Sequence, residues 1–154
     1  MPPAAKAIRI AASSVALVAL AFFALGVARA HEGHSTPWAV PPSEKLVKNP
    51  VAAGADSIGR GKPLYAKNCL ACHGATGDGK GPVAQRLGFT AGDLTDANHM
   101  AVQTDGELFW KIATGRDPMP GYKKDRGFTD SQIWDLVNYT RTLAASSQTK
   151  PAAK

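Results

Sequence analysis

One five-residue segment constrains this chain most: residues 69–73 read Cys-Leu-Ala-Cys-His. A Cys-x-x-Cys-His segment is the attachment signal for c-type haem. Haem carries two vinyl groups on neighbouring pyrrole rings, and each can add one thiol to form a thioether. Residues three apart lie on the same face of a helix, so both thiols can reach the vinyl groups while His73 turns toward the iron. The segment therefore predicts one haem, joined covalently to Cys69 and Cys72.

Two other uses of a Cys-x-x-Cys pair agree less well with this chain. A structural zinc site needs four ligands, and the sequence has no third cysteine. A thioredoxin-like dithiol belongs to a scaffold of strands and helices, and no run of residues here is convincingly strand-like. Haem attachment is favoured, with zinc and dithiol chemistry as the alternatives.

Residues 1–30 have the layout of a secretory signal peptide. Two basic residues and no acid precede an apolar run at 10–27, and residues 28–30 read Ala-Arg-Ala. A basic start, an apolar stretch and a small-x-small cleavage site are the three parts of such a signal. We therefore expect cleavage after Ala30 and export to the periplasm. An uncleaved anchor is the alternative, because a run of about eighteen apolar residues reaches the lower limit for a membrane-spanning helix.

The exported chain should contain one folded domain between two irregular segments. Residues 31–56 are rich in proline, alanine, glycine and small polar residues, which is typical of a linker or of an extension draped over a domain. This extension begins with His31 and His34, a pair that could bind copper but is more often simply solvated on such a tail. Residues 57–145 should form the domain, and residues 146–154 a disordered tail.

The charge of the chain gives no support for nucleic-acid binding. The formal net charge is +6, but the leader contains three of the 18 basic residues and none of the 12 acidic ones. Two haem propionates would cancel most of the remaining excess of 15 over 12. A protein that binds nucleic acid needs a clustered basic face, and contact with a membrane is expected only if the leader is retained.

Helices are predicted on both sides of a glycine-rich loop. Apolar residues recur at helical spacing from Ser57 into the haem segment. Residues 74–82 contain four glycines and a proline, which predicts a loop. Thr104 and Thr129 each begin a capping box, so a helix should start at each. Gly115 should end the helix that starts at Thr104.

Two further residues are candidates for the haem site. Met119 lies between two prolines, so it cannot belong to a helix and is better placed to present its sulfur than to fill a core. Pro82 ends the glycine-rich loop, and its carbonyl oxygen could accept a hydrogen bond from Nδ1 of His73. Such a bond would fix the tautomer and orientation of an iron-bound histidine.

These segments together resemble the monohaem class I cytochromes c of bacteria. The likeness covers about residues 57–145. Besides the haem segment it rests on Arg60-Gly61-x-x-Leu64-Tyr65, the Gly-Asp-Gly-Lys-Gly-Pro loop at 77–82, the stretch from Asp105 to Trp110 leading to Gly115, Met119-Pro120-Gly121-Tyr122 and Trp134-x-x-Val137-x-Tyr139. The resemblance implies a small all-α fold wrapped around one covalently bound haem c, with its first and last helices crossing near Gly61 and Tyr139.

The same resemblance implies the roles of individual residues. His73 would be the proximal iron ligand and Met119 the distal one, with the Pro82 carbonyl as the partner of His73. Trp110 and Arg116 would lie near the haem propionates.

Met100 and His99 are rivals for the sixth iron position. They lie on a stretch without flanking prolines, and the family pattern favours the Met-Pro pair at 119–120.

Histidine and methionine ligands together predict a single-electron carrier rather than an enzyme. They leave no open iron position, and the thioether sulfur favours ferrous iron. Partners would be redox proteins met transiently, because such complexes have small interfaces whose formation is steered by charge. Lys123, Lys124 and Arg126 follow Met119 closely and are candidates for docking, with ordinary solvated side chains as the alternative.

Two other functions stay open from the sequence. The chain could be a dedicated subunit of a periplasmic dehydrogenase, reductase or oxidase complex that binds through residues 31–56. It could also be a haem enzyme with weak peroxidase or gas-binding activity, which would require the sixth ligand to leave. A stoichiometric partner on purification would favour the subunit, and spectra of high-spin iron would favour the enzyme.

Overall fold

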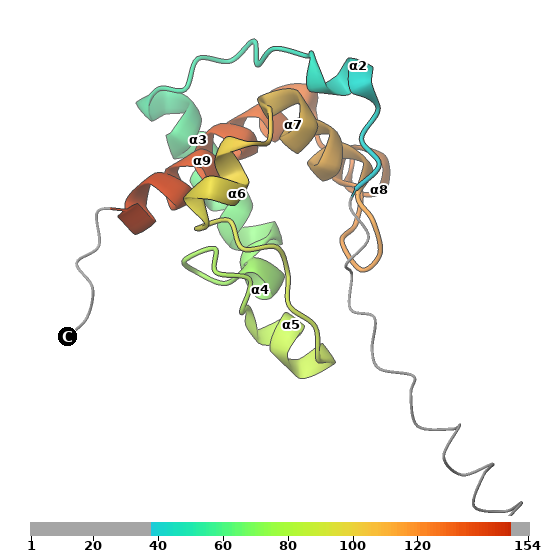
Figure 1. Cartoon of the computed structure of the whole chain (residues 1–154), viewed down its shortest axis with the longest axis vertical. Helices are drawn as coiled ribbons and strands as arrows, with labels where there is room; N and C mark the ends of the chain where they lie inside the picture. The colour runs from blue at the N-terminus through green and yellow to red at the C-terminus, as the bar shows by residue number, and fades with distance from the viewer. Residues whose placement is uncertain (1–37, 149–154) are drawn as a thin grey trace, which may run out of the picture. The chain divides into compact units, whose positions relative to one another are not determined.

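The computed structural model of the protein describes residues 38–148 (Figure 1). The predicted signal peptide, the His31 and His34 pair and the end of the predicted tail lie outside these residues. In the described part the elements are all helical, and the β-type pairing there is an isolated bridge between Arg116 and Met119. The predicted all-α class is confirmed. None of the helices within 38–148 is long and apolar enough to cross a membrane.

Eight helices follow one another along residues 38–148. They are α2 (Pro42–Lys45), α3 (Ala55–Asn68), α4 (Leu70–His73), α5 (Pro82–Leu87), α6 (Ala97–Ala101), α7 (Asp105–Thr114), α8 (Tyr122–Arg126) and α9 (Asp130–Gln148). The first predicted helix, α3, begins two residues before Ser57.

Thr104 and Thr129 both cap the helices predicted to start at them, and the reciprocal bonds of a capping box are present at Thr129. The Thr104 hydroxyl accepts a hydrogen bond from the Glu107 amide at 3.1 Å at the start of α7. At the start of α9 the Thr129 amide donates to the Gln132 side chain at 2.9 Å, and the Gln132 amide donates back to the Thr129 hydroxyl at 3.3 Å. These bonds satisfy amide groups that a helix leaves unpaired at its first turn. Gly115 ends α7, as predicted.

The two longest helices, α3 and α9, cross at a glycine. A β-carbon at Gly61 would lie 2.1 Å from the backbone oxygen of Asp135 and 2.8 Å from Cβ of Tyr139. Only a residue without a side chain lets the two backbones approach so closely. The predicted crossing near Gly61 and Tyr139 is therefore confirmed.

A buried carboxylate joins the same two helices. The side chain of Asp135 is 3% exposed, and it accepts hydrogen bonds from Ser57 at 2.6 Å and from Arg60 at 2.8 Å. Burial by itself would raise the pKa of Asp135, but the hydrogen bonds from Arg60 and Ser57 and the charge of Arg60 outweigh it and hold the pKa below its ordinary value. The carboxylate is thus charged at neutral pH.

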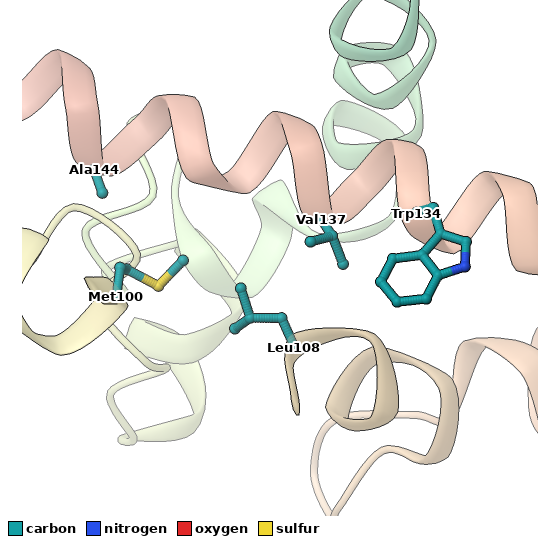
Figure 2. Packing of buried hydrophobic residues seen from close by; sticks show 5 residues of the cluster. All are labelled: Met100, Leu108, Trp134, Val137 and Ala144. Carbon is teal, nitrogen blue, oxygen red and sulfur yellow. The ribbon is translucent and has the colours of Figure 1, made fainter. Parts of the chain in front are cut away.

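Apolar side chains pack along α9 in two clusters. One cluster consists of Met100, Leu108, Trp134, Val137 and Ala144 (Figure 2). The other contains Tyr65, Leu136 and Leu143. Phe109 also stacks on Trp134, with ring centroids 4.2 Å apart. Since both clusters include residues of α9, this helix organises the core.

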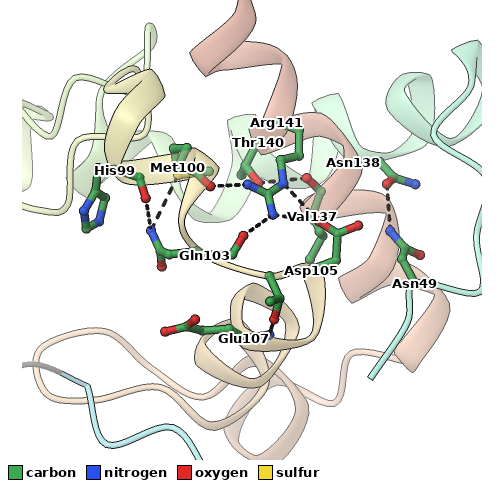
Figure 3. A network of polar contacts seen from close by, with 11 residues as sticks. Asn49, His99, Met100, Gln103, Asp105, Glu107, Val137, Asn138, Thr140 and Arg141 are labelled. Atoms are coloured by element: carbon green, nitrogen blue, oxygen red, sulfur yellow. Dashed lines mark hydrogen bonds and ion pairs between the residues drawn. The ribbon is translucent and has the colours of Figure 1, made fainter. Parts of the chain in front are cut away.

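Arg141 of α9 fixes the turn between α6 and α7 (Figure 3). Its guanidinium donates to the backbone oxygens of Met100 and Gln103, the latter at 2.6 Å, and to the Asp105 carboxylate at 2.8 Å. A planar guanidinium carries five donors in a fixed arrangement, so one side chain can hold several acceptors at once. The start of α7 is thereby tied to the core.

Residues 38–54, which we call the strap, are the described part of the predicted extension. The strap includes α2, which lies beside α7 (Figure 1). A β-carbon at Gly106 of α7 would lie 2.1 Å from the backbone oxygen of Glu44. Asn49 donates to Asn138 of α9 at 2.8 Å (Figure 3). The strap is therefore packed against α7 and α9 at defined points.

Candidate haem site

The haem segment forms a helical turn that continues from α3. Cys69 caps the end of α3, donating its amide to the Tyr65 carbonyl at 2.8 Å, and the His73 amide donates to the Cys69 carbonyl at 2.9 Å. Both thiols are free and half-buried. In residues 38–148 no group of three or more His, Cys, Asp or Glu side chains gathers as a metal site. Two unpaired thiols and an imidazole on one turn fit thioether attachment of haem rather than zinc binding.

The surroundings of Cys69 favour an uncharged sulfur. Burial raises the pKa of the Cys69 thiol to about 12, although the nearby Tyr122 hydroxyl acts in the opposite direction. The Tyr122 hydroxyl donates its hydrogen bond to the Asn68 carbonyl at 2.6 Å, which links α8 to the end of α3. A thioether carries no charge, so it suits this position. Sequence reasoning noted Tyr122 only as part of the Met-Pro-Gly-Tyr segment.

The imidazole of His73 has a different partner from the one predicted. Its Nδ1 lies 3.0 Å from the carbonyl oxygen of Gly92, not from that of Pro82. Pro82 is the first residue of α5, and in a helix the carbonyl of residue i accepts from the amide of residue i+4. Burial lowers the pKa of His73, although the hydrogen bond to Gly92 opposes this shift. A neutral imidazole is the form that binds a metal.

Met119 lies on a closed hairpin between α7 and α8. Its amide donates to the Arg116 carbonyl at 2.7 Å, and the Arg116 amide donates back to the Met119 carbonyl at 2.9 Å. Gly115 has φ +67°, and a β-carbon there would lie 2.3 Å from the Gly121 nitrogen. We call residues 115–121 the hairpin. It leaves the Met119 side chain half-buried and outside the core clusters.

The two rivals for the sixth ligand occupy different environments. Met100 is 1% exposed and points toward Leu108 and Val137 (Figure 2). His99 is exposed on α6. The Met100 sulfur is therefore surrounded by the core, while Met119 is free of that packing.

The cytochrome c family profile matches residues 58–144. The chain belongs to the cytochrome c family. It is a class I c-type cytochrome. The protein carries covalently bound haem c, and Cys69, Cys72 and His73 are the residues whose arrangement fits this group.

This cytochrome c is similar to proteins that are named as parts of larger assemblies. The cytochrome bc1 complex cytochrome c subunit of Mycobacterium leprae is 33% identical over 91 residues, which are 59% of this chain and 28% of the relative. A chain of the Kuenenia stuttgartiensis reducing HAO-like protein complex Kustc0457/Kustc0458 is 27% identical with a TM-score of 0.51, over 63% of this chain and 49% of that one. The cytochrome thus spans less than half of the length of either protein.

The two predicted propionate contacts of the cytochrome lie together around Trp38 of the strap. The guanidinium carbon of Arg116 is 4.7 Å from the centroid of the Trp38 ring. Trp110 meets the same ring edge-on, with centroids 6.2 Å apart. Sequence reasoning gave Trp38 no role, because a tryptophan in a proline-rich segment carries no sign of what it will contact.

The basic residues predicted for docking lie on α8, directly after the hairpin. Lys123, Lys124 and Arg126 are all exposed. Lys123 is paired with Asp130 at 2.6 Å, and both side chains are more than half exposed. An ion pair so exposed contributes little to stability, but it reduces the charge that Lys123 offers to a partner.

Proposed function

We propose that this cytochrome c carries single electrons in the periplasm, with His73 and Met119 as the two axial ligands of its iron. The observation that carries the proposal is the contrast between the two methionines. Met100 is packed into the core, whereas Met119 is presented by the closed hairpin. The predicted signal peptide supports export of the chain.

The ligand pair explains why the protein would transfer electrons without transforming a substrate. Bound haem supplies an iron that alternates between the ferric and ferrous states. His73 and Met119 would both bind the iron, leave it no open position and raise its reduction potential. The Gly92 carbonyl holds Nδ1 of His73, so Nε2 would be the nitrogen that binds the iron.

Partners would be redox proteins that bind around the face carrying the hairpin and α8. Both related proteins are named as parts of complexes, which supports a protein partner rather than a small molecule. Lys124 and Arg126 would steer an acidic partner toward this face. Electron-transfer rates with the physiological partner should then fall as salt is added.

A dedicated subunit of a redox complex is the second candidate, favoured by the names of the same two relatives. Purification from the native cells separates the two possibilities. A partner recovered in a stoichiometric amount supports a subunit, and a monomeric cytochrome supports a free carrier.

The ligand assignment is tested by removing each methionine in turn. Met119→Ala should abolish the weak near-infrared band of methionine bound to ferric haem. Met100→Leu is the matched control, since a swap that conserves volume in the core destabilises by less than about 1.5 kcal/mol. The control should keep the band. A band that survives in Met119→Ala and is lost in Met100→Leu would assign the sixth position to Met100.

A further inference from the structure

Trp38 is the point at which the strap contacts the hairpin side of the molecule. Its ring has Arg116 at 4.7 Å, Trp110 edge-on at 6.2 Å and the Lys111 ammonium at 6.0 Å. Cations within about 6 Å of an aromatic ring are attracted by its negative face. Arg116 is the nearer cation, and Lys111 also binds Glu107 and Gln103 at 3.0 and 2.6 Å. The main polar contact of Trp38 is therefore the Arg116 guanidinium.

Arg116 connects this ring to the methionine. The two backbone hydrogen bonds of the hairpin join Arg116 directly to Met119. A displacement of Arg116 therefore strains or breaks the bonds that close the hairpin. Since Trp38 lies against the guanidinium, it restrains the residue on which the hairpin closes.

Trp38 can act in this way because the strap is itself anchored. Val40, two residues further along, is buried. The strap then packs α2 against Gly106 and reaches α9 through the hydrogen bond between Asn49 and Asn138. A side chain on an anchored segment loses less conformational freedom when it makes a contact than one on a free tail. The ring is thus held in place by contacts well removed from the hairpin.

We propose that Trp38 is a positioning residue, which stacks on Arg116 to keep the hairpin closed and Met119 in place as an iron ligand. The inference rests on the proposed function in one respect, the ligation by Met119. It assigns to the extension an intramolecular role that differs from partner binding. Its consequence is that loss of the Trp38 ring lets the hairpin open more often without unfolding the domain.

Imidazole binding to the ferric holoprotein measures how often the hairpin opens, because imidazole must displace the methionine. The affinity of such a ligand scales with the population of the open form. Trp38→Ala should therefore raise the apparent affinity for imidazole by about fivefold or more, as expected for the loss of stacking with Arg116 and Trp110. Trp38→Phe keeps an aromatic face, so its affinity for imidazole should lie between those of Trp38→Ala and the wild type.

Asn49→Ala is the matched control for this experiment. It also loosens the strap, but at α9 rather than at the hairpin, so the imidazole affinity should stay within about twofold of the wild type. Hydrogen exchange of the Met119 amide provides a second measurement on the same proteins. This exchange should be faster in Trp38→Ala and unchanged in Asn49→Ala.

Two results would overturn the inference. One is an imidazole affinity of Trp38→Ala equal to that of the wild type. The other is an equal rise in imidazole affinity in Trp38→Ala and Asn49→Ala, which would indicate general loosening of the strap. A wild-type protein that lacks the near-infrared methionine band would instead contradict the ligation by Met119, and this failure is visible before any variant is compared.

Discussion

His73 ends a turn that continues from the 14-residue helix α3, whereas Met119 lies on a short hairpin between α7 and α8. The helix on the histidine side crosses α9 at Gly61, and Asp135 joins the two helices through a buried carboxylate. The hairpin is closed by two backbone hydrogen bonds and touched from outside by the strap. In the proposed iron site, the histidine side is thus built into the core, and the methionine side is a local structure attached to it.

This difference separates two kinds of stability. Contacts of the core break only when the whole domain unfolds, whereas a loop closed by local bonds can open while the rest stays folded. Changes at the crossing of α3 and α9 should therefore lower the free energy of unfolding of the whole domain. They should affect the binding of the methionine only because the domain is less stable. Changes at the hairpin should weaken the binding of Met119 to the iron and change the free energy of unfolding much less.

The largest effect is expected at the crossing, for Gly61→Ala. The added methyl group would meet backbone atoms of α9 at 2.1 Å, and such overpacking should lower the free energy of unfolding by about 3 kcal/mol or more. Gly59→Ala is the matched control, because Gly59 is in the same helix and a β-carbon there meets nothing within 4 Å. It should stabilise the protein by about 0.5–1 kcal/mol. Denaturant unfolding of the two variant holoproteins measures this difference in stability. Equal free energies of unfolding would contradict the close approach of α3 and α9 at Gly61.

Asp135→Asn should have an intermediate effect that depends on pH. The native pKa of Asp135 is lower than its ordinary value, so the charged carboxylate stabilises the fold above about pH 4. This stabilisation is lost as the pH falls through the native pKa, because the unfolded chain, in which Asp135 has its ordinary pKa, binds a proton more readily than the folded protein. At pH 7 the variant should melt roughly 5 °C below the wild type.

Thermal melts of both proteins between pH 2 and 7 measure this dependence. The two melting temperatures should converge at the acid end of the range. A difference that stays constant down to pH 2 would show that the Asp135 charge does not stabilise the crossing.

Local patterns predicted the elements well because each depends on residues close together in sequence. The haem segment and the boxes at Thr104 and Thr129 are each defined within five residues, and all three form the expected turns. The glycine at the crossing was expected from the family resemblance, and the structure supplies its physical reason. In these places the local sequence and the tertiary fold agree.

The features of the site that the sequence did not predict depend on backbone atoms or on contacts between residues far apart in the chain. The Gly92 carbonyl that replaces Pro82 beside His73 belongs to a residue with no side chain, so nothing in the sequence distinguishes it. Met100 was a rival ligand because a methionine in a sequence looks the same whether it fills a core or binds iron. The contact of Trp38 with Arg116 joins residues 38 and 116, which no local pattern relates.

The smallest change in unfolding is expected for Gly115→Ala, although its effect on the methionine should be large. An alanine at φ +67° and ψ 174°, a region essentially restricted to glycine, is strained by about 1–3 kcal/mol, and its methyl group would also meet Gly121 at 2.3 Å. Opening of the hairpin relieves both the backbone strain and the clash with Gly121. The free energy of unfolding should therefore fall by only about 1 kcal/mol, while the methionine band weakens or disappears.

Gly127→Ala tests a positive φ without a clash, because Gly127 is in the left-handed helical region at φ +69° and has open space around it. This variant should show a similar loss of stability and keep the band, since it strains the backbone without forcing the hairpin apart. If Gly115→Ala destabilised the protein as much as Gly61→Ala and kept its band, the hairpin would be as much a part of the core as the helix crossing. The distinction between the two sides of the site would then be wrong.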